Sequence, residues 1–380
     1  MSRRSLHTPA PDAAALRARL DRARSAAAAA DTDALLIAPG SDLRYLIGQA
    51  GGSFERLTTL VVPADGTPAL VVPKLEAPGY ADVPTDELGV ELVTWVDGDD
   101  PYALVADRLG KPGRVAVSDF TPALHVLALR TALGTAEQTL AGPVVRELRM
   151  RKDAAEVASL RDAGAAIDRV HARVHEWLRP GRTEAEVGAD IAAAIVEEGH
   201  VQADFVIVGS GPNGASPHHD VSGRVIEKGD VVVVDIGGPL PAGYNSDSTR
   251  TYAVGTPRDA DVAETYAVLQ RAQAAAVAAV KPGVTAEAVD AAARDVIAEA
   301  GFGEYFIHRT GHGIGLDVHE EPYIIAGNAL PLEPGMAFSV EPGIYQPGRW
   351  GARIEDIVIV TADGVESVNN QPHELVVLDA

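Results

Sequence analysis

The stretch that decides the fold runs from Val231 to Thr251 and reads VVVVDIGGPLPAGYNSDSTRT. Four valines form an apolar, β-branched run that ends on Asp235, a connection rich in Gly and Pro follows, and a second β-prone run begins around Asp247. The pattern predicts a hairpin with a carboxylate on each arm. A buried, ionised aspartate is costly unless a cation or strong donors compensate it, and two facing carboxylates repel. A shared metal is one interpretation; in the alternative, Asp235 caps a strand and Asp247 lies in a solvated turn.

Composition narrows the chemistry that such a site can use. The chain has 380 residues, no cysteine and a formal net charge of -22. Without cysteine there are no disulfides, thiolate ligands or cysteine nucleophiles, so a metal must be bound by carboxylates and histidines. The acidic excess would repel nucleic acids and anionic membranes, and no apolar run approaches the roughly 18 residues of a membrane span. The N-terminus lacks the apolar core of a signal peptide, and we expect a cytoplasmic protein.

The length of the chain favours two domains. In residues 31–145, short apolar runs alternate with turns and short helical segments, which predicts a small α/β domain at 1–145. From about residue 143 the apolar spacing becomes helical and ends at Pro180, which predicts a long linking helix that opens a second domain at 146–380. Further helices are predicted at 183–200, 261–280 and 285–301.

Three histidines lie in segments rich in Gly or Pro. His218 belongs to SPHHD, His312 lies among glycines in RTGHGIG, and His319 follows seven residues later. The glycines would let the backbone bend tightly and bring an imidazole close to a centre without a clash from Cβ. Solvated loop histidines and a generic Gly-rich turn are the alternatives at this point.

A second hairpin near the C-terminus repeats the pattern of the first. An apolar strand ends on Glu341, a Pro-Gly pair turns the chain, and a returning strand at 353–360 carries Arg353 and Glu355 on one face. Each half of the second domain, before and after about residue 257, thus supplies helices and one carboxylate-bearing hairpin. We expect two similar halves that enclose one site.

Five of these side chains can act together as oxygen or nitrogen ligands: Asp235, Asp247, His312, Glu341 and Glu355. The set suffices for two divalent ions with bridging carboxylates, and its hard donors suit Mn or Co, with Zn or Fe(II) as alternatives. Two ions about 3.5 to 4 Å apart can hold a water, lower its pKa and clamp a tetrahedral intermediate. A G-x-S-x-G elbow is missing from the sequence, so a serine hydrolase has no support. The prediction is hydrolysis without a protein nucleophile.

The motifs VDIG, NSDSTRT, GHGIGLDVHE, VEPGIY and RIED occur in this order, preceded by DLRYLIG and ERLTTLVVPADG. With them the chain resembles, over nearly its whole length, the pita-bread metallopeptidases, the group of methionine aminopeptidase, aminopeptidase P, prolidase and creatinase. The resemblance implies an α+β fold, in which a pita-bread catalytic domain with pseudo-symmetric halves follows a smaller α/β creatinase/prolidase-type domain. It also implies a dinuclear metal-dependent hydrolase of the Xaa-Pro bond in dipeptides or short peptides, and a homodimer.

The resemblance further implies a role for each matching ligand. Asp235 and Asp247 match the first two ligands, and Asp247 and Glu355 match the bridging pair. His312 and Glu341 match ligands of one metal. Glu341 also matches the group that takes the proton from the bridging water.

Three more residues match family positions beside the ligands. His218 matches the histidine that contacts the substrate or the leaving group, and His319 matches the one that stabilises the tetrahedral oxyanion through a donated N–H. Arg353 matches an arginine that supports the ligands, where it could orient Glu355 or Asp247.

Two features depart from the family pattern. Eleven residues separate Asp235 from Asp247 where most relatives have ten, so the hairpin tip GGPLPAG carries one extra residue. Tyr323 stands where archaeal-type prolidases often place an arginine that binds a dipeptide's carboxylate, which weakens the dipeptidase interpretation relative to Xaa-Pro hydrolysis as a whole. Aminopeptidase P therefore stays an alternative to Xaa-Pro dipeptidase. The intact ligand set disfavours a creatinase-like C–N hydrolase and a non-catalytic binding protein on this fold.

Overall fold

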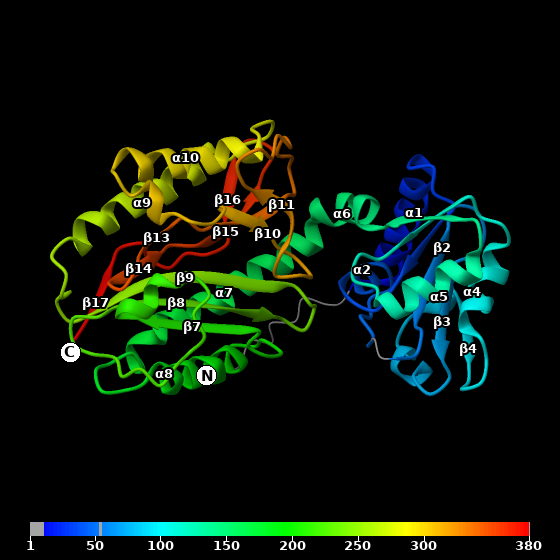
Figure 1. Cartoon of the computed structure of the whole chain (residues 1–380), viewed down its shortest axis with the longest axis horizontal. Coiled ribbons are helices and arrows are strands. Elements are labelled where there is room, and N and C mark those ends of the chain that lie inside the picture. The colour runs from blue at the N-terminus through cyan, green and yellow to red at the C-terminus, as the bar shows by residue number, and fades with distance from the viewer. Residues whose placement is uncertain (1–10, 53–54, 380) are drawn as a thin grey trace. The chain divides into compact units, whose positions relative to one another are not determined.

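The computed structural model describes residues 11–52 and 55–379. They form two compact units, with the boundary between Arg149 and Met150, and each unit is drawn in Figure 1. Within the described ranges, no helix is long and apolar enough to cross a bilayer.

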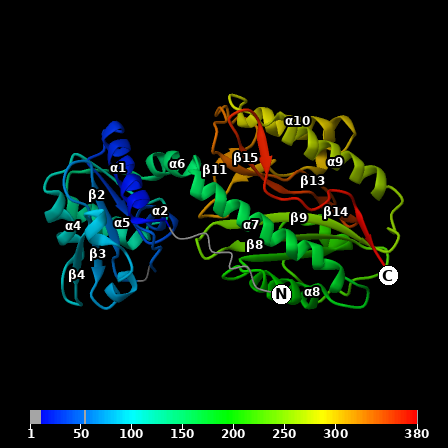
Figure 2. The ribbon, with the colours of Figure 1, turned by 180° about the vertical axis from the view of Figure 1, so that it is seen from behind.

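The N-terminal unit is a mixed six-stranded sheet with helices on both faces (Figures 1 and 2). The strand order is β4-β3-β2-β1-β5-β6, with β1 (Ala34–Ile37), β2 (Thr59–Pro63), β3 (Ala69–Pro73), β4 (Glu91–Trp95), β5 (Arg114–Val117) and β6 (Glu137–Leu140). The helices are α1 (Ala13–Ala29), α2 (Ser41–Ile47), α3 (Thr85–Leu88), α4 (Pro101–Leu109), α5 (Ala123–Leu133) and α6 (Gly142–Met150). The core strands read as unbroken apolar runs because helices cover both of their faces.

The C-terminal unit consists of two halves of similar construction (Figures 1 and 2). In the first, α7 (Ala154–Arg173) and α8 (Glu184–Glu197) pack on the sheet β17-β9-β8-β7, formed by β7 (Phe205–Ser210), β8 (Val231–Pro239), β9 (Asn245–Val254) and β17 (Val376–Leu378). In the second, α9 (Val262–Ala279) and α10 (Ala286–Glu299) pack on the other strands. These are β10 (Gly311–Gly313), β11 (Glu320–Ile324), β12 (Ala337–Val340), β13 (Gly343–Gln346), β14 (Trp350–Arg353), β15 (Asp356–Val360) and β16 (Val365–Ser367). The prediction of two similar halves is confirmed.

The prediction of one long linking helix from residue 143 to Pro180 is wrong. Two helices, α6 and α7, occupy this stretch and are separated at Arg151–Asp153. Arg151 forms a β-bridge with Met336, which draws the backbone out of the helix. Asp153 then starts α7 as the first residue of a capping box with Glu156.

Both predicted hairpins differ in detail from the observed ones. In the first, residues 237–239 of the predicted tip are paired in β8, and only residues 240–244 connect the strands. In the second, the predicted turn at Pro342 is wrong, because the chain continues into the extra arm β13–β14 before it returns. β12 still pairs antiparallel with β15, with Val340 opposite Asp356, and the predicted strand 353–360 is interrupted between β14 and β15.

Candidate metal centre

Side chains from both halves of the C-terminal unit converge on one cavity of ≈ 1320 Å³. The predicted site residues that line it are Asp235, Asp247, His312, Glu341, Glu355, His218, His319 and Arg353. Asp235 and Asp247 come from β8 and β9, His312 comes from β10, and Glu341 and Glu355 lie next to the ends of β12 and β15. All eight predicted site residues are therefore brought together.

The register of β8 and β9 places both aspartates on one face of the sheet. Asp247 lies opposite Gly237, and Asp235 lies opposite Thr249. Because side chains alternate across a strand, Asp235 and Gly237 share a face, and Asp247 becomes the diagonal neighbour of Asp235. Antiparallel pairing thus places both carboxylates where they could bind one centre.

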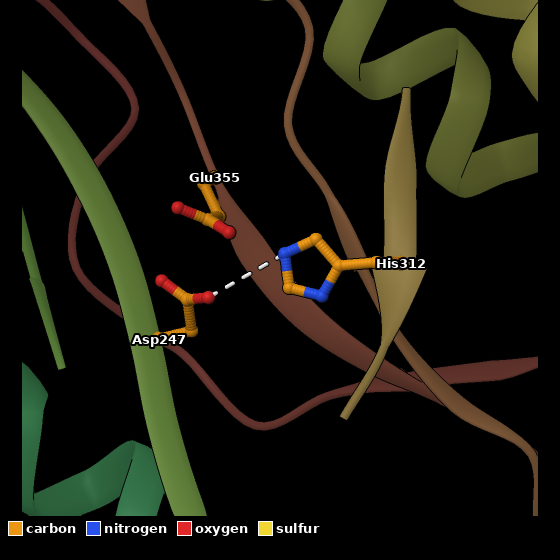
Figure 3. A group of neighbouring side chains, drawn as sticks. All are labelled: Asp247, His312 and Glu355. Atoms are coloured by element: carbon orange, nitrogen blue, oxygen red, sulfur yellow. Dashed lines mark ion pairs between the residues drawn. The ribbon is translucent and has the colours of Figure 1, made fainter. Parts of the chain in front are cut away.

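Figure 3 shows Asp247, His312 and Glu355 pointing toward one another. One ligand atom from each lies within 4.8 Å of the others. The Nε2 atom of His312 is 3.6 Å from Oδ2 of Asp247 and 3.3 Å from Oε1 of Glu341. Its Nδ1 lies 3.1 Å from the carbonyl oxygen of Gly313; since a carbonyl can only accept, Nδ1 holds the proton and Nε2 offers its lone pair to the carboxylate cluster.

The glycines around His312 are required by close backbone contacts. A Cβ at Gly311 would lie 1.8 Å from the carbonyl oxygen of Ser339, and one at Gly313 would lie 2.2 Å from that of Glu321. β10 is thus squeezed between β11 and β12, and only glycine fits on either side of the ligand.

Arg353 and Thr249 connect the ligands from the two halves. The Arg353 guanidinium donates to Oδ2 of Asp235 at 2.6 Å and to the Thr249 hydroxyl at 3.0 Å. That hydroxyl donates in turn to Oε2 of Glu355 at 2.6 Å. Arg353 therefore contacts Asp235 directly and reaches Glu355 through Thr249, whereas the sequence had suggested Glu355 or Asp247 as its partner.

The centre carries more buried negative charge than the protein compensates. Burial raises the pKa of Asp247 and of Glu355, and the neighbouring carboxylates raise both further. Burial raises the pKa of Glu341 to about 7 against the opposing charge of Arg353. Oδ1 of Asp235 is buried and has no hydrogen-bond partner in the described part of the chain. Four carboxylates facing one guanidinium fit a site for divalent cations.

The neutral state of His312 also suits a metal ligand. Burial and, next, the neighbouring His319 hold the pKa of His312 well below its ordinary value. The two rings meet edge to face, with centroids 4.0 Å apart. His319 therefore lies directly beside a ligand, as a group that could act on bound substrate would have to.

The loop that carries His218 is anchored by a residue that sequence reasoning missed. Glu184, whose side chain is fully buried, accepts bonds from Ser210, Asn213, Ser222 and His219. The bond from His219 fixes the His-His pair at the cavity wall. Nothing in the sequence marks Glu184, because it reads as an ordinary residue in the first turn of α8.

Tyr345 is another missed residue, and its only signal is its position in the motif VEPGIY. Its hydroxyl accepts a bond from Arg353 at 2.7 Å and lies 2.9 Å from Nε2 of His308. The Tyr345 hydroxyl thereby holds one nitrogen of the Arg353 guanidinium, while another nitrogen donates to Asp235.

Comparison with known proteins gives consistent matches over both units. A family model described as metallopeptidase family M24 matches residues 158–362, and one described as creatinase/prolidase N-terminal domain matches residues 19–151. The protein named probable dipeptidase PepE from Mycobacterium tuberculosis is 63% identical over 368 residues, which cover 97% of this chain and 98% of that protein. The Xaa-Pro dipeptidase from Lactobacillus helveticus is 37% identical over 345 residues, 88% of this chain and 92% of its own. The crystal structure of dipeptidase PepE from Mycobacterium ulcerans has a TM-score of 0.94 and 61% identity, covering 98% of this chain and 100% of that one.

Proposed function

Because this chain belongs to metallopeptidase family M24 and carries a creatinase/prolidase N-terminal domain, we propose that it uses two divalent metal ions to hydrolyse the Xaa-Pro bond at the N-terminus of dipeptides or short peptides. The observation that carries the proposal is the buried, uncompensated cluster of four carboxylates and one neutral histidine in a single cavity. The names of the relatives, dipeptidase and Xaa-Pro dipeptidase, support the substrate.

The residues that would hold the ions are Asp235, Asp247, His312, Glu341 and Glu355. Their hard oxygen and imidazole donors favour Mn or Co, with Zn or Fe as alternatives. When bound, such a pair of ions supplies Lewis-acid chemistry, because it lowers the pKa of water and stabilises negative charge on the scissile carbonyl.

The protein side chains then divide the remaining work. Glu341, which accepts a 3.0 Å bond from Ser339, takes the proton from the attacking water and is held in place by that bond. His319 donates an N–H to the oxygen of the tetrahedral intermediate, and His218 contacts the substrate at the leaving-group side. Arg353 orients Asp235 and, through Thr249, Glu355.

The test is hydrolysis of an Xaa-Pro dipeptide by metal-loaded protein, with the matching Xaa-Ala dipeptide as substrate control. We expect cleavage of the proline peptide with Mn or Co, loss of activity after thorough chelation, and recovery when metal returns. His312→Ala and Glu341→Gln should abolish cleavage, whereas the exposed His175→Ala should not. Full activity in a chelated sample would contradict the metal mechanism, and inertness toward both Xaa-Pro dipeptide and Xaa-Pro-Yaa tripeptide would contradict the substrate assignment.

A homodimer and a cytoplasmic location stay predictions. Sedimentation of the purified protein tests the first, and fractionation of the source cells tests the second.

A further inference from the structure

Three arginines line the cavity of the metal centre, and two of them are already paired with carboxylates. Arg353 donates to Asp235 at 2.6 Å. Arg294 makes two bonds of 2.9 Å to Asp290. Arg309, which is half-buried, has no carboxylate within ion-pair distance among the residues that the structure describes. It is therefore the cavity arginine whose charge is still available.

The Arg309 guanidinium rests on an aromatic ring. Its Cζ atom lies 4.5 Å from the centroid of Tyr323 on β11, a geometry that stabilises a cation without neutralising it. Tyr323 and Arg309 belong to different segments, since Tyr323 lies on β11 and Arg309 lies just before β10.

The backbone on both sides of Arg309 is fixed by one buried carboxylate. Asp290 accepts bonds from the amide and the hydroxyl of Thr310 at 3.0 and 2.8 Å. It also binds Arg294, which donates to the carbonyl oxygen of His308 at 2.8 Å. The residues before and after Arg309 are thus locked, so that its side chain starts from a preorganised position.

Arg309 lines the same cavity as His319 and the four carboxylates. In a dipeptide the C-terminal carboxylate is only about one residue length, roughly 3.5 Å, beyond the scissile bond. A cation that receives it must therefore line the same cavity as the reacting centre, as Arg309 does.

We propose that Arg309, supported by the ring of Tyr323, binds the C-terminal carboxylate of the substrate and makes this enzyme a dipeptidase. The inference rests on the proposed function and names its substrate class. The carboxylate clusters elsewhere in the cavity would repel an anionic terminus, so that an arginine fork supplies both attraction and bidentate geometry. A Xaa-Pro-Yaa tripeptide carries its carboxylate one residue farther away and loses this contact. The cavity volume does not distinguish a dipeptide from a tripeptide, because ≈ 1320 Å³ exceeds what a dipeptide requires.

The experiment compares an Xaa-Pro dipeptide with its C-terminal amide, which has the same scissile bond and no negative charge. With wild-type enzyme we expect the acid to have a KM about tenfold lower than the amide, the usual scale for a charged hydrogen bond. Arg309→Met should bring the two KM values to within about twofold, and Arg309→Lys should keep part of the preference. Arg271→Met, at an exposed position on α9, is the matched control.

Binding separates this inference from the proposed function. An analogue with a reduced peptide bond, as free acid and as amide, is titrated calorimetrically into metal-loaded protein. If the acid binds tighter in an Arg309-dependent way although no Xaa-Pro peptide is cleaved, the proposed function fails and the carboxylate site stands. If wild type binds acid and amide equally, or Arg309→Met weakens both equally, the inference is overturned whether or not the enzyme cleaves Xaa-Pro peptides. Thermal unfolding of each variant checks that its fold is intact.

Discussion

Replacement of Glu341 by glutamine is expected to change stability in opposite directions in metal-free and metal-loaded protein. Burial raises the pKa of Glu341 from 4.5 to about 7 in the folded chain. The folded state therefore holds this proton more tightly than the unfolded state, and the metal-free protein loses stability as the pH rises from about 4.5 to about 7. At about 1.4 kcal/mol per pKa unit, the loss is about 3 kcal/mol. Glutamine cannot ionise and can still accept the bond from Ser339, so the chelated variant should avoid this loss.

The assay is urea unfolding of chelated protein at pH 5 and at pH 8, followed by tryptophan fluorescence. At pH 8, Glu341→Gln should exceed wild type in unfolding free energy by up to about 3 kcal/mol, and the gap should shrink toward pH 5. With Mn at 1,000 Kd the order reverses, because wild type gains about 4.1 kcal/mol, which exceeds the advantage of the chelated variant, and the variant lacks one ligand. Glu264→Gln, at an exposed position on α9, serves as control. A chelated variant that is no more stable than wild type at pH 8, or an advantage independent of pH, would refute the reasoning.

Three further substitutions test the supports of the site. Thr249→Val removes the hydroxyl that joins Arg353 to Glu355, and should lower metal affinity by about 10- to 100-fold in a calorimetric titration; Thr249→Ser should retain the affinity, and equal losses in both variants would argue against a role of the hydroxyl. Glu184→Gln should lower the unfolding free energy by about 2 to 3 kcal/mol, because one amide oxygen cannot serve every donor around this buried position; a neutral effect in urea unfolding would contradict this. Gly313→Ala forces a Cβ against a backbone oxygen 2.2 Å away and should cost about 2 kcal/mol or more, whereas Gly364→Ala meets open space; similar melting curves for the two would be inconsistent with a squeezed β10.

The residues that converge on the cavity could be predicted because each belongs to a short local pattern. Asp235 and Glu341 end apolar strands, and His312 lies between glycines that a side chain could not replace. Such patterns span only a few residues, so they can be recognised without knowledge of the rest of the fold. Their order along the chain then carried the resemblance to the family.

The supports of the site could not be predicted, because they depend on partners far apart in sequence. Arg353 and Asp235 are 118 residues apart, and the sequence around each of them does not indicate that their side chains form a hydrogen bond. Glu184 looks like a helix-start residue until β7 and the following loop surround it. The arm β13–β14 was missed for a related reason: Pro342 and Gly343 have the composition of a turn, and only pairing of Gly343 with Arg353 turns this segment into a strand.

The backbone contact between β9 and residue 355 restricts how this enzyme can move. Thr249 and Glu355 form a β-bridge, with the Glu355 amide donating to the Thr249 carbonyl at 3.1 Å. Glu355, one of the predicted ligands, is therefore part of the joint between the halves. A hinge opening of the halves, of the kind that admits substrate in many two-lobed enzymes, would pull the ligand set apart. Substrate entry and product release must accordingly occur without separation of the two halves, so that the carboxylate cluster keeps its arrangement throughout turnover.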